Sequence, residues 1–367
     1  MGLTRLKTIE SPVGAQIVID GRPYINFAGS SYLGLSARPD LLEAGAATLK
    51  ASGSGYQLSR HYGIATRAHR HVEAEAAAFF QAEAAMYLGG GYLFGLVALA
   101  ALRDGFDAIF FDELAHHSTK EAIAASGLPA HSFRHLDAGD LQAQLKQLLQ
   151  PGQRPLVVTD GMYSVFGEIA PLDLIAQVTM PYGGRIVIDE SHSFGVIGET
   201  GRGACEHHRM PVPSVLVGGS TCKAFGVVGG IIVASENEIE KLRVAPAGRG
   251  ASAGLPAAAQ MCALSLRYVR EHPELLRRLR ENVSYMKRVL RGIGLAVGDS
   301  IAPVATFATE PGKSMAALQQ QLMAEGIYVF HSHYIGAGPR GVIRCGIFAD
   351  HTRDHIDQLA DALRRLL

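Results

Sequence analysis

The sequence lacks the features that mark secreted and membrane-spanning proteins. It contains only 4 cysteines, and the spacing of Cys205, Cys222, Cys262 and Cys345 shows no pairs, which favours a reducing compartment. No hydrophobic run approaches the roughly 20 residues that a membrane helix needs. The start, Met1-Gly2-Leu3-Thr4-Arg5, has no hydrophobic stretch typical of a signal peptide. We therefore expect a cytoplasmic protein without a membrane span.

The chain also lacks net charge. It has 34 basic and 34 acidic residues, and no basic cluster stands out. This balance argues against nucleic acid and against anionic membranes as the main partner. Hydrophobic residues are abundant, at 48% of 367 residues, and a chain of this length buries a large core in roughly two domains. These properties are typical of a metabolic enzyme.

Short strand signals alternate with helical ones through the first two thirds of the chain. The spacing of hydrophobic residues predicts helices over 67–83 and 93–102. Short runs rich in β-branched residues predict strands at 86–88, 108–111, 156–159, 186–189, 215–217 and 230–233. Such alternation predicts an α/β fold with a mostly parallel sheet covered by helices on both faces.

The two ends of the chain differ from this pattern. Strand signals at 16–19 and 22–27 open the sequence. A long helical stretch over 257–290 is expected to lead into a smaller C-terminal domain. That domain ends in an amphipathic helix over 352–367.

The most informative motif is STCKAFGVVGG at 220–230, which places Lys223 among small residues. A lysine becomes a nucleophile when its ammonium loses a proton, and a tight hydrophobic turn favours that loss. The motif therefore indicates that Lys223 forms a Schiff base with pyridoxal 5'-phosphate.

A second motif supports this interpretation from upstream. The run 185–189 predicts a buried strand with Asp189 at its carboxyl end, where open α/β sheets place ligands. Pyridoxal chemistry needs a carboxylate to keep the pyridine nitrogen protonated, so that the ring acts as an electron sink. Asp189 suits that role. His192 is close enough in sequence to reach the phenolic oxygen of the ring or an incoming substrate carbonyl.

Taken together, the motifs resemble the α-oxoamine synthases, a family of fold-type-I pyridoxal phosphate enzymes. The resemblance is carried by 189–203 and 220–226. Further matching stretches follow in the family's order and cover nearly the whole chain: 32–35, 59–63, 112–118, 160–164, 344 and 350–352. The resemblance implies an aspartate aminotransferase-like fold with a mostly parallel central sheet. It divides the chain into an N-terminal arm (1–46), a large cofactor-binding domain (47–285) and a small C-terminal α+β domain (286–367).

A glycine cluster, 89–91, lies between a predicted strand and a predicted helix. Glycines let backbone N–H groups approach an anion at a helix N-terminus, where the helix dipole also helps. The resemblance implies that Gly91 and Tyr92 hold the cofactor phosphate here. The same glycines with Asp112 imitate a dinucleotide site, so a Rossmann-type NAD-dependent oxidoreductase is a rival hypothesis. A nicotinamide enzyme has no use for Asp189, His192 and Lys223, which favours pyridoxal phosphate.

The resemblance implies further cofactor contacts. It places the imidazole of His116 on the cofactor ring, although a histidine between a strand and a helix is also a common helix cap. Ser164 matches a serine that hydrogen-bonds near the phenolic oxygen, or it only forms a turn. Ser220 matches a phosphate-binding threonine. Ser252 matches residues that reach the phosphate in the partner subunit, which implies a homodimer with active sites at the subunit interface.

Substrate binding is assigned to Arg344 and Ser30. The resemblance implies that Arg344 binds the amino-acid carboxylate, and a planar guanidinium suits both oxygens; the alternative is an arginine held in a salt bridge. His331 with His333 and His207 with His208 lack a third ligand at suitable spacing. We therefore expect no metal site.

The expected reaction joins a small amino acid to an acyl thioester, carried by CoA or by an acyl-carrier protein. Lys223 removes the Cα proton, Asp189 stabilises the resulting charge through the ring, and His192 hydrogen-bonds the developing oxyanion. The resemblance implies loss of carbon dioxide and an α-aminoketone product. An aminotransferase or a lyase on the same fold remains open, since Lys223 and Asp189 serve those reactions equally well. A non-catalytic pyridoxal-binding regulator is the third alternative.

The chain departs from the family at several positions. Many members carry asparagine where this chain has Ser30, Gly95 and Ala115, and an Asp-Gly-Asp turn is replaced by Phe166-Gly167-Glu168. Asparagine offers two donors and an acceptor, so its loss removes hydrogen bonds that orient a substrate. We therefore expect an altered substrate preference.

Overall fold

The structure is a computed structural model that describes residues 6–55, 59–210, 215–250, 253–309 and 314–367. These residues form two compact units. The larger comprises Arg38–Tyr163 and Glu168–Pro273. The smaller comprises the described parts of Met1–Ala37 and Glu274–Leu367, together with Ser164–Gly167. The division into an arm and two domains at 46/47 and 285/286 stays a prediction, because compactness does not test which segments fold independently.

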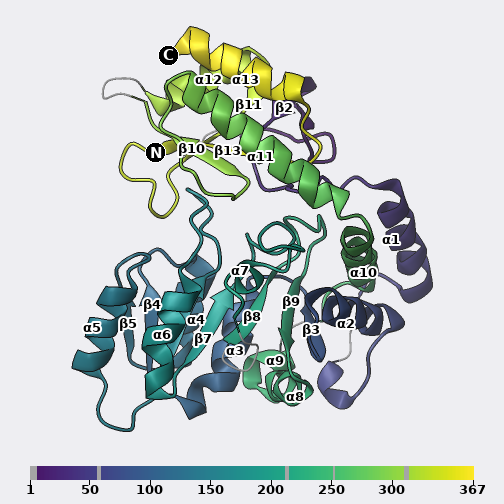
Figure 1. Cartoon of the computed structure of the whole chain (residues 1–367). Coiled ribbons are helices and arrows are strands. Elements are labelled where there is room, and N and C mark those ends of the chain that lie inside the picture. Colours follow the sequence, from purple (N-terminus) through teal and green to yellow (C-terminus); the bar gives the residue numbers. More distant parts are fainter. Residues whose placement is uncertain (1–5, 56–58, 211–214, 251–252, 310–313) are drawn as a thin grey trace. The chain divides into compact units, whose positions relative to one another are not determined.

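A seven-stranded sheet organises the larger unit (Figure 1). Five adjacent strands of this sheet run parallel to one another, and the strand Gly230–Ala234 runs antiparallel to the strand on either side of it. The predicted mostly parallel sheet is therefore confirmed. The strands, in their order across the sheet, are β3 (Ala84–Leu88), β9 (Gly230–Ala234), β8 (Val215–Ser220), β7 (Arg185–Asp189), β6 (Pro155–Asp160), β4 (Ala108–Asp112) and β5 (Ala130–Phe133).

Helices cover both faces of this sheet, as the alternation of side chains along β3 shows. Met86 and Leu88 pack in one hydrophobic core with α3 (Leu93–Leu102). Tyr87, between them, faces α2 (Arg67–Phe80), where its ring lies 6.1 Å from that of His69. Adjacent residues of a strand point to opposite faces, so the two helices lie on opposite sides.

The remaining helices extend these two layers. On the side of α3, contacts join α4 (His117–Ser126), α8 (Glu236–Val244) and α9 (Pro246–Gly250). On the side of α2, α10 (Pro256–Glu271) packs on α2 and α1 (Pro39–Ser52) packs on α10. The other helical segments of the larger unit are η1 (Arg60–Tyr62), η2 (Arg103–Gly105), α5 (Ala138–Leu148), α6 (Leu172–Thr179), η3 (Met180–Tyr182) and α7 (Ala204–His207).

The single helical stretch expected over 257–290 is wrong in one respect. The structure contains two helices there, because α10 ends at Glu271 and α11 (Glu274–Gly292) begins after His272 and Pro273. Proline has no N–H to donate to the preceding turn and disfavours a helical residue before it. The break separates the two units along the chain, since Pro273 ends one and Glu274 begins the other.

Two small sheets build the smaller unit. In the first, β1 (Gln16–Ile19) pairs antiparallel with β2 (Arg22–Asn26), and β11 (Ile327–Tyr328) adds in parallel. In the second, β13 (Val342–Gly346) lies between β10 (Val304–Phe307) and β12 (Phe330–Ser332). The helices of this unit are α11, α12 (Met315–Ala324) and α13 (Arg353–Leu366).

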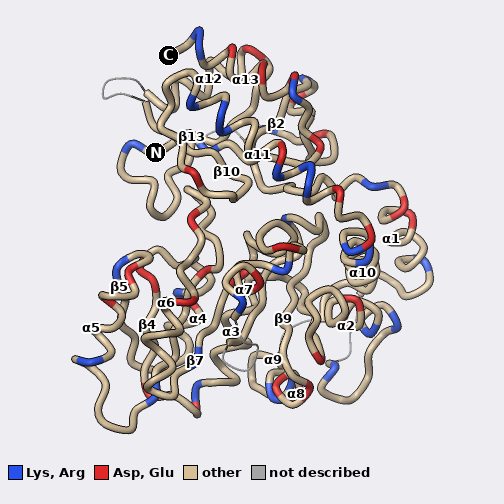
Figure 2. The backbone as a smooth tube through the Cα atoms, viewed as in Figure 1, with Lys and Arg blue, Asp and Glu red and all other residues tan. Residues whose placement is uncertain are grey.

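Charged residues follow no single-sign pattern in either unit. Lys and Arg are interspersed with Asp and Glu along the backbone (Figure 2). Within the described residues, every helix is too short or too polar to span a bilayer.

A partly buried ion cluster in the larger unit centres on His135. Its Nδ1 lies 2.9 Å from Asp112 Oδ1 and its Nε2 lies 3.2 Å from Glu168 Oε2. The edge of its ring faces Tyr163, with 4.4 Å between the ring centroids. Burial lowers the pKa of His135, but the hydrogen bonds and charges of Asp112 and Glu168 outweigh burial and raise the pKa from 6.5 to about 9. His135 is therefore an imidazolium that joins the end of β4 to the chain before α6.

This cluster predicts a pH-dependent stability. A raised pKa in the folded state contributes stability that is fully present below the unfolded pKa and is lost as pH rises through about 9. Replacing His135 with Gln removes the charge, so the loss should be on the order of 2 kcal/mol at mildly acidic pH and should shrink toward alkaline pH. Urea unfolding across this range measures the difference, with exposed His333→Gln as the control. A difference that stays constant with pH would contradict the assigned charge.

Candidate active site

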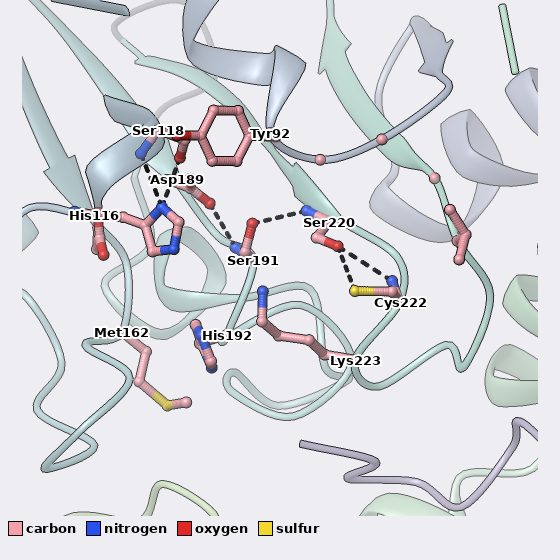
Figure 3. A pocket seen from close by; sticks show the side chains of 15 residues that line it. Tyr92, His116, Ser118, Met162, Asp189, Ser191, His192, Ser220, Cys222 and Lys223 are labelled. Atoms are coloured by element: carbon pink, nitrogen blue, oxygen red, sulfur yellow. Dashed lines mark hydrogen bonds between the residues drawn. The ribbon is translucent and has the colours of Figure 1, made fainter. Parts of the chain in front are cut away.

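The carboxyl ends of the central strands open into one cavity of about 300 Å³ in the larger unit. Residues at the ends of β6, β7 and β8 line it, together with the segments that follow β3 and β4. Figure 3 shows their side chains around a common space. The predicted site residues that the structure brings together here are Lys223, Asp189, His192, His116, Ser220, Gly91 and Tyr92.

Lys223 is presented by a turn that closes between β8 and β9. The backbone N–H of Thr221 donates to the carbonyl of Gly229 at 3.0 Å, and its hydroxyl donates to the carbonyl of Val227 at 2.8 Å. Gly226 takes a φ of +67° within the turn, a conformation that favours glycine. The anchored turn directs the Lys223 side chain into the cavity (Figure 3). The tight turn therefore explains the small residues around Lys223.

Two adjacent acids at the end of β7 have different surroundings. Asp189 lines the cavity, is 8% exposed, and accepts a hydrogen bond from the N–H of Ser191 at 2.9 Å. Glu190 is fully buried and accepts from the backbone N–H groups of Ala204 and Cys205, both at 2.8 Å. Glu190 thus holds the following loop in place, and Asp189 supplies the carboxylate that faces the cavity.

His116 both caps a helix and lines the cavity. It is the N-cap of α4, and its Nδ1 accepts from the N–H of Ser118 at 3.1 Å. A backbone N–H can only donate, so Nδ1 carries no proton and Nε2 does. Burial, with the nearby Lys223 and His117, lowers the pKa of His116 against the opposing charge of Asp189. The ring is therefore a neutral imidazole, which suits stacking on a flat aromatic group, and the capping alternative also holds.

The glycine cluster approaches Ser220 too closely for any side chain. A Cβ on Gly91 would lie 2.4 Å from the Cβ of Ser220 and 2.5 Å from its Cα. The first turn of α3 begins here, because the N–H of Phe94 donates to the Gly91 carbonyl at 3.0 Å. Ser220 itself is fixed by its N–H, which donates to Ser191 Oγ at 2.8 Å. Hydroxyl groups and a helix N-terminus thus meet at one end of the cavity, where they fit a phosphate group.

Three other predicted residues, Arg344, Ser164 and Ser30, lie in the smaller unit. Arg344 hydrogen-bonds to the backbone of the segments that contain the other two. Arg344 is 6% exposed; its Nε donates to the carbonyl of Ser164 at 2.6 Å and its Nη1 donates to the carbonyl of Gly29, next to Ser30, at 2.9 Å. Its Nη2 lies 3.4 Å from the hydroxyl of Tyr32. Within the part of the chain that the structure describes, no carboxylate forms an ion pair with Arg344, so the salt-bridge alternative is wrong for those residues. Its hydrogen-bond partners among the described residues are neutral.

The structure also brings residues to the cavity that sequence reasoning missed. Asp160, Ser191, Met162 and Cys222 line it beside the predicted set. Asp160 ends β6 as Asp189 ends β7, and an acid at the end of a buried strand was a signal that pointed to it. The predicted Ser252 lies outside the described residues. Among those residues, no group of three histidine, cysteine or acidic side chains is placed to hold a metal.

Two of the departures from the family pattern lie at closely packed positions. A Cβ on Gly95 would lie 3.0 Å from the Cβ of Ala122, so α3 and α4 are in close contact at this point. Ala115 is fully buried. A larger polar side chain at either position would need both space and hydrogen-bond partners.

Comparisons with known proteins agree with this geometry. The family profile described as "Aminotransferase class I and II" matches residues 22–363. The 8-amino-7-oxononanoate synthase of Fervidobacterium nodosum is 30% identical over 98% of this chain and 93% of its own length. That of Methylococcus capsulatus is 32% identical over 97% of this chain and 92% of its own length.

A solved structure shows the same fold. The serine palmitoyltransferase of Sphingomonas wittichii is 27% identical, covers 98% of this chain and 91% of its own length, and superposes with a TM-score of 0.91. The fold is therefore that of the fold-type-I pyridoxal phosphate transferases, as predicted. Family profile, relatives and fold together show that the chain belongs to the aminotransferase class I and II family and, within it, to the α-oxoamine synthases.

Proposed function

We propose that the protein is a pyridoxal phosphate-dependent acyltransferase. It condenses a small amino acid with an acyl thioester and releases carbon dioxide to give an α-aminoketone. The observation that carries this proposal is the convergence of Lys223, Asp189, His192 and His116 on one cavity. The names of the relatives support it, because 8-amino-7-oxononanoate synthases and serine palmitoyltransferase are enzymes of the α-oxoamine synthase family.

The residues of the cavity fit the cofactor. The phosphate would lie at the end of the cavity lined by Gly91, Tyr92 and Ser220, whose hydroxyl also contacts Cys222. Asp189 would hold the proton of the pyridine nitrogen, and the neutral ring of His116 would stack on the cofactor ring. When bound, pyridoxal phosphate supplies an aldehyde for the lysine amine and an electron sink for charge that develops at the substrate Cα.

The protein's own side chains then carry the proton transfers. Lys223, on its anchored turn, takes the Cα proton of the amino acid as a general base and returns a proton to the product. His192 donates a hydrogen bond to the oxygen that becomes negative when the thioester is attacked.

Arg344 binds the carboxylate of the amino acid. A buried guanidinium without an acidic partner is costly, and its observed acceptors, the carbonyls of Ser164 and Gly29, are neutral. A substrate carboxylate supplies the missing negative charge in the bidentate geometry that guanidinium favours. Ser164 and Ser30 help to shape this site.

The four cysteines are consistent with a cytoplasmic location, which we include in the proposal. All four are free thiols, and Cys262 and Cys345 are buried. Thiols that persist as thiols are typical of a reducing compartment.

We also propose that the protein is a homodimer. Large apolar residues are exposed around the carboxyl end of β3: Tyr62 at 76%, Val228 at 66%, Tyr92 at 46% and Leu255 at 38%. Tyr87 holds their segments together. Its carbonyl accepts from Arg60 at 2.6 Å, its hydroxyl donates to the carbonyl of Val228 at 2.9 Å, and a Cβ on Gly254 would lie 3.3 Å from its ring.

Exposed apolar groups gathered in this way are typical of an interface. Because Tyr92 and Val228 also line the cavity, the dimer contact would adjoin the active site.

The central prediction concerns Lys223. The wild-type protein reconstituted with pyridoxal phosphate should be yellow, and borohydride reduction followed by peptide mass spectrometry should find the cofactor attached to Lys223. Lys223→Ala should lose the attachment and at least about a thousandfold in turnover. Exposed Lys146→Ala, in α5, is the matched control and should behave as wild type. A colourless wild-type protein would refute the proposal.

The departures at Ser30, Gly95 and Ala115 predict an altered substrate preference. Pimeloyl, acetyl, succinyl and palmitoyl thioesters, each with its usual amino acid, should all react with kcat/KM below about 10⁴ M⁻¹s⁻¹, the lower end of the ordinary enzyme range. Release of free thiol measures the condensation. A parallel assay with a 2-oxo acid tests the aminotransferase alternative. If one of the four pairs reaches that range, the departures do not affect preference.

The dimer prediction uses two leucines of equal exposure. Leu255, near the proposed interface, and Leu148, at the end of α5, are each 38% exposed. Leu255→Glu should weaken dimerisation at least about tenfold because it buries an unpaired charge, whereas Leu148→Glu should not. Sedimentation velocity over a concentration series measures both. An active wild-type monomer would rule out the dimer.

A further inference from the structure

A second carboxyl group lies beside Asp189 in the wall of the cavity. Asp160 ends β6, and the strand register pairs Asp160 directly with Asp189. The two residues are 7% and 8% exposed, and both line the cavity. The proposed reaction assigns a role to Asp189 and none to Asp160.

Hydrogen bonds to the two carboxyl groups are not equivalent. Asp189 Oδ1 accepts from the N–H of Ser191 at 2.9 Å, which favours its charged form. Asp160 Oδ1 accepts from the N–H of His116 at 3.3 Å, a longer and weaker contact. Of the pair, Asp189 is therefore the better stabilised as an anion.

Several charged groups face Asp160. Asp189 on β7 and Asp112 at the end of β4 disfavour its ionisation; Lys223, on the turn after β8, favours it. The hydrogen bond from His116 also favours ionisation, while the ring of His116 is neutral. Tyr163, the other titratable neighbour, is a neutral phenol whose pKa burial raises. Burial and the charge of Asp189 dominate, and they raise the pKa of Asp160 well above its usual range.

We propose that Asp160 keeps its proton at neutral pH and acts as a positioning residue for Asp189 and Lys223. This inference rests on the proposed function, because it assigns Asp189 as the one ionised carboxylate at the cofactor ring. A second negative charge would repel the Asp189 carboxylate and would draw the Lys223 side chain into an ion pair, away from the position assigned to the cofactor. A protonated Asp160 prevents both effects and still accepts the hydrogen bond from His116.

Infrared spectroscopy of the cofactor-free protein tests the protonation directly. The wild-type minus Asp160→Asn difference spectrum at neutral pH should contain the C=O band of a carboxylic acid. Asp104→Asn, at a site that is 96% exposed, should instead give carboxylate bands. Carboxylate bands for Asp160 would overturn the proposal. Since no cofactor is present, this result is independent of whether Lys223 binds pyridoxal phosphate.

The pH dependence of the reaction tests the positioning role. Asn has the charge of a protonated Asp but cannot ionise. The alkaline limb of the kcat/KM profile should therefore move to higher pH in Asp160→Asn, because no group that can ionise remains at position 160. A pH profile identical to that of wild type would show a merely structural role and would overturn the proposal.

A measurement on the unmodified chain covers the case in which Asp160→Asn does not fold. Wild-type protein labelled with ¹³C in its aspartate carboxyl groups should show a carboxylic acid band at neutral pH that shifts relative to the unlabelled protein. The absence of any isotope-shifted acid band would mean that every aspartate is ionised, and the proposal would fail.

Discussion

The lateral register between β6 and β7 is the constraint on which the candidate site depends. Pairing of Leu156 with Arg185 places Asp160 opposite Asp189, and pairing of β7 with β8 places Asp189 opposite Gly218. Side chains alternate between the faces of a sheet, so a slip of either strand by one residue would move the side chains of that strand to the wrong face. Val158 and Val187 lie in the core beneath α3, and such a slip would replace them with residues that belong to the other face. The packing of the core thereby fixes the carboxyl groups at the cavity.

The reactivity of Lys223 depends on there being few charged groups at this edge of the sheet. Lys223 must lose a proton to act as a nucleophile or a base, and each nearby anion opposes that loss. His116 is neutral because burial lowers its pKa and its Nδ1 accepts from a backbone N–H. Glu190 is directed away from the cavity, into hydrogen bonds with the backbone of the following loop. These arrangements leave Asp189 as the carboxylate assigned to the cofactor ring.

Local sequence was sufficient for the residues that sit at strand ends. Lys223, Asp189 and His192 could be predicted because a buried hydrophobic run ends where they begin, and their residue types suit one chemistry. Asp160 ends a strand in the same way, but its importance comes from pairing with Asp189, which is a non-local fact. The edge strand β5 gave little signal because only Phe133 in it is buried. The predicted helix over 257–290 ignored Pro273, whose effect on the preceding turn was visible in the sequence.

The sequence could not predict which segments form the smaller unit, because three stretches that are separate in the chain combine in it. The unit in which each departure from the family lies determines which contacts that departure can change. Gly95 lies at the close contact between α3 and α4, and Ala115 is fully buried in the larger unit. Ser30 is half-buried next to Gly29, whose carbonyl accepts from Arg344. Serine in place of the family's asparagine changes the polar surroundings of Arg344 at a position that is not in the packed core. Of the three departures, Ser30 is therefore the one that we expect to affect substrate preference, through the carboxylate-binding role proposed for Arg344.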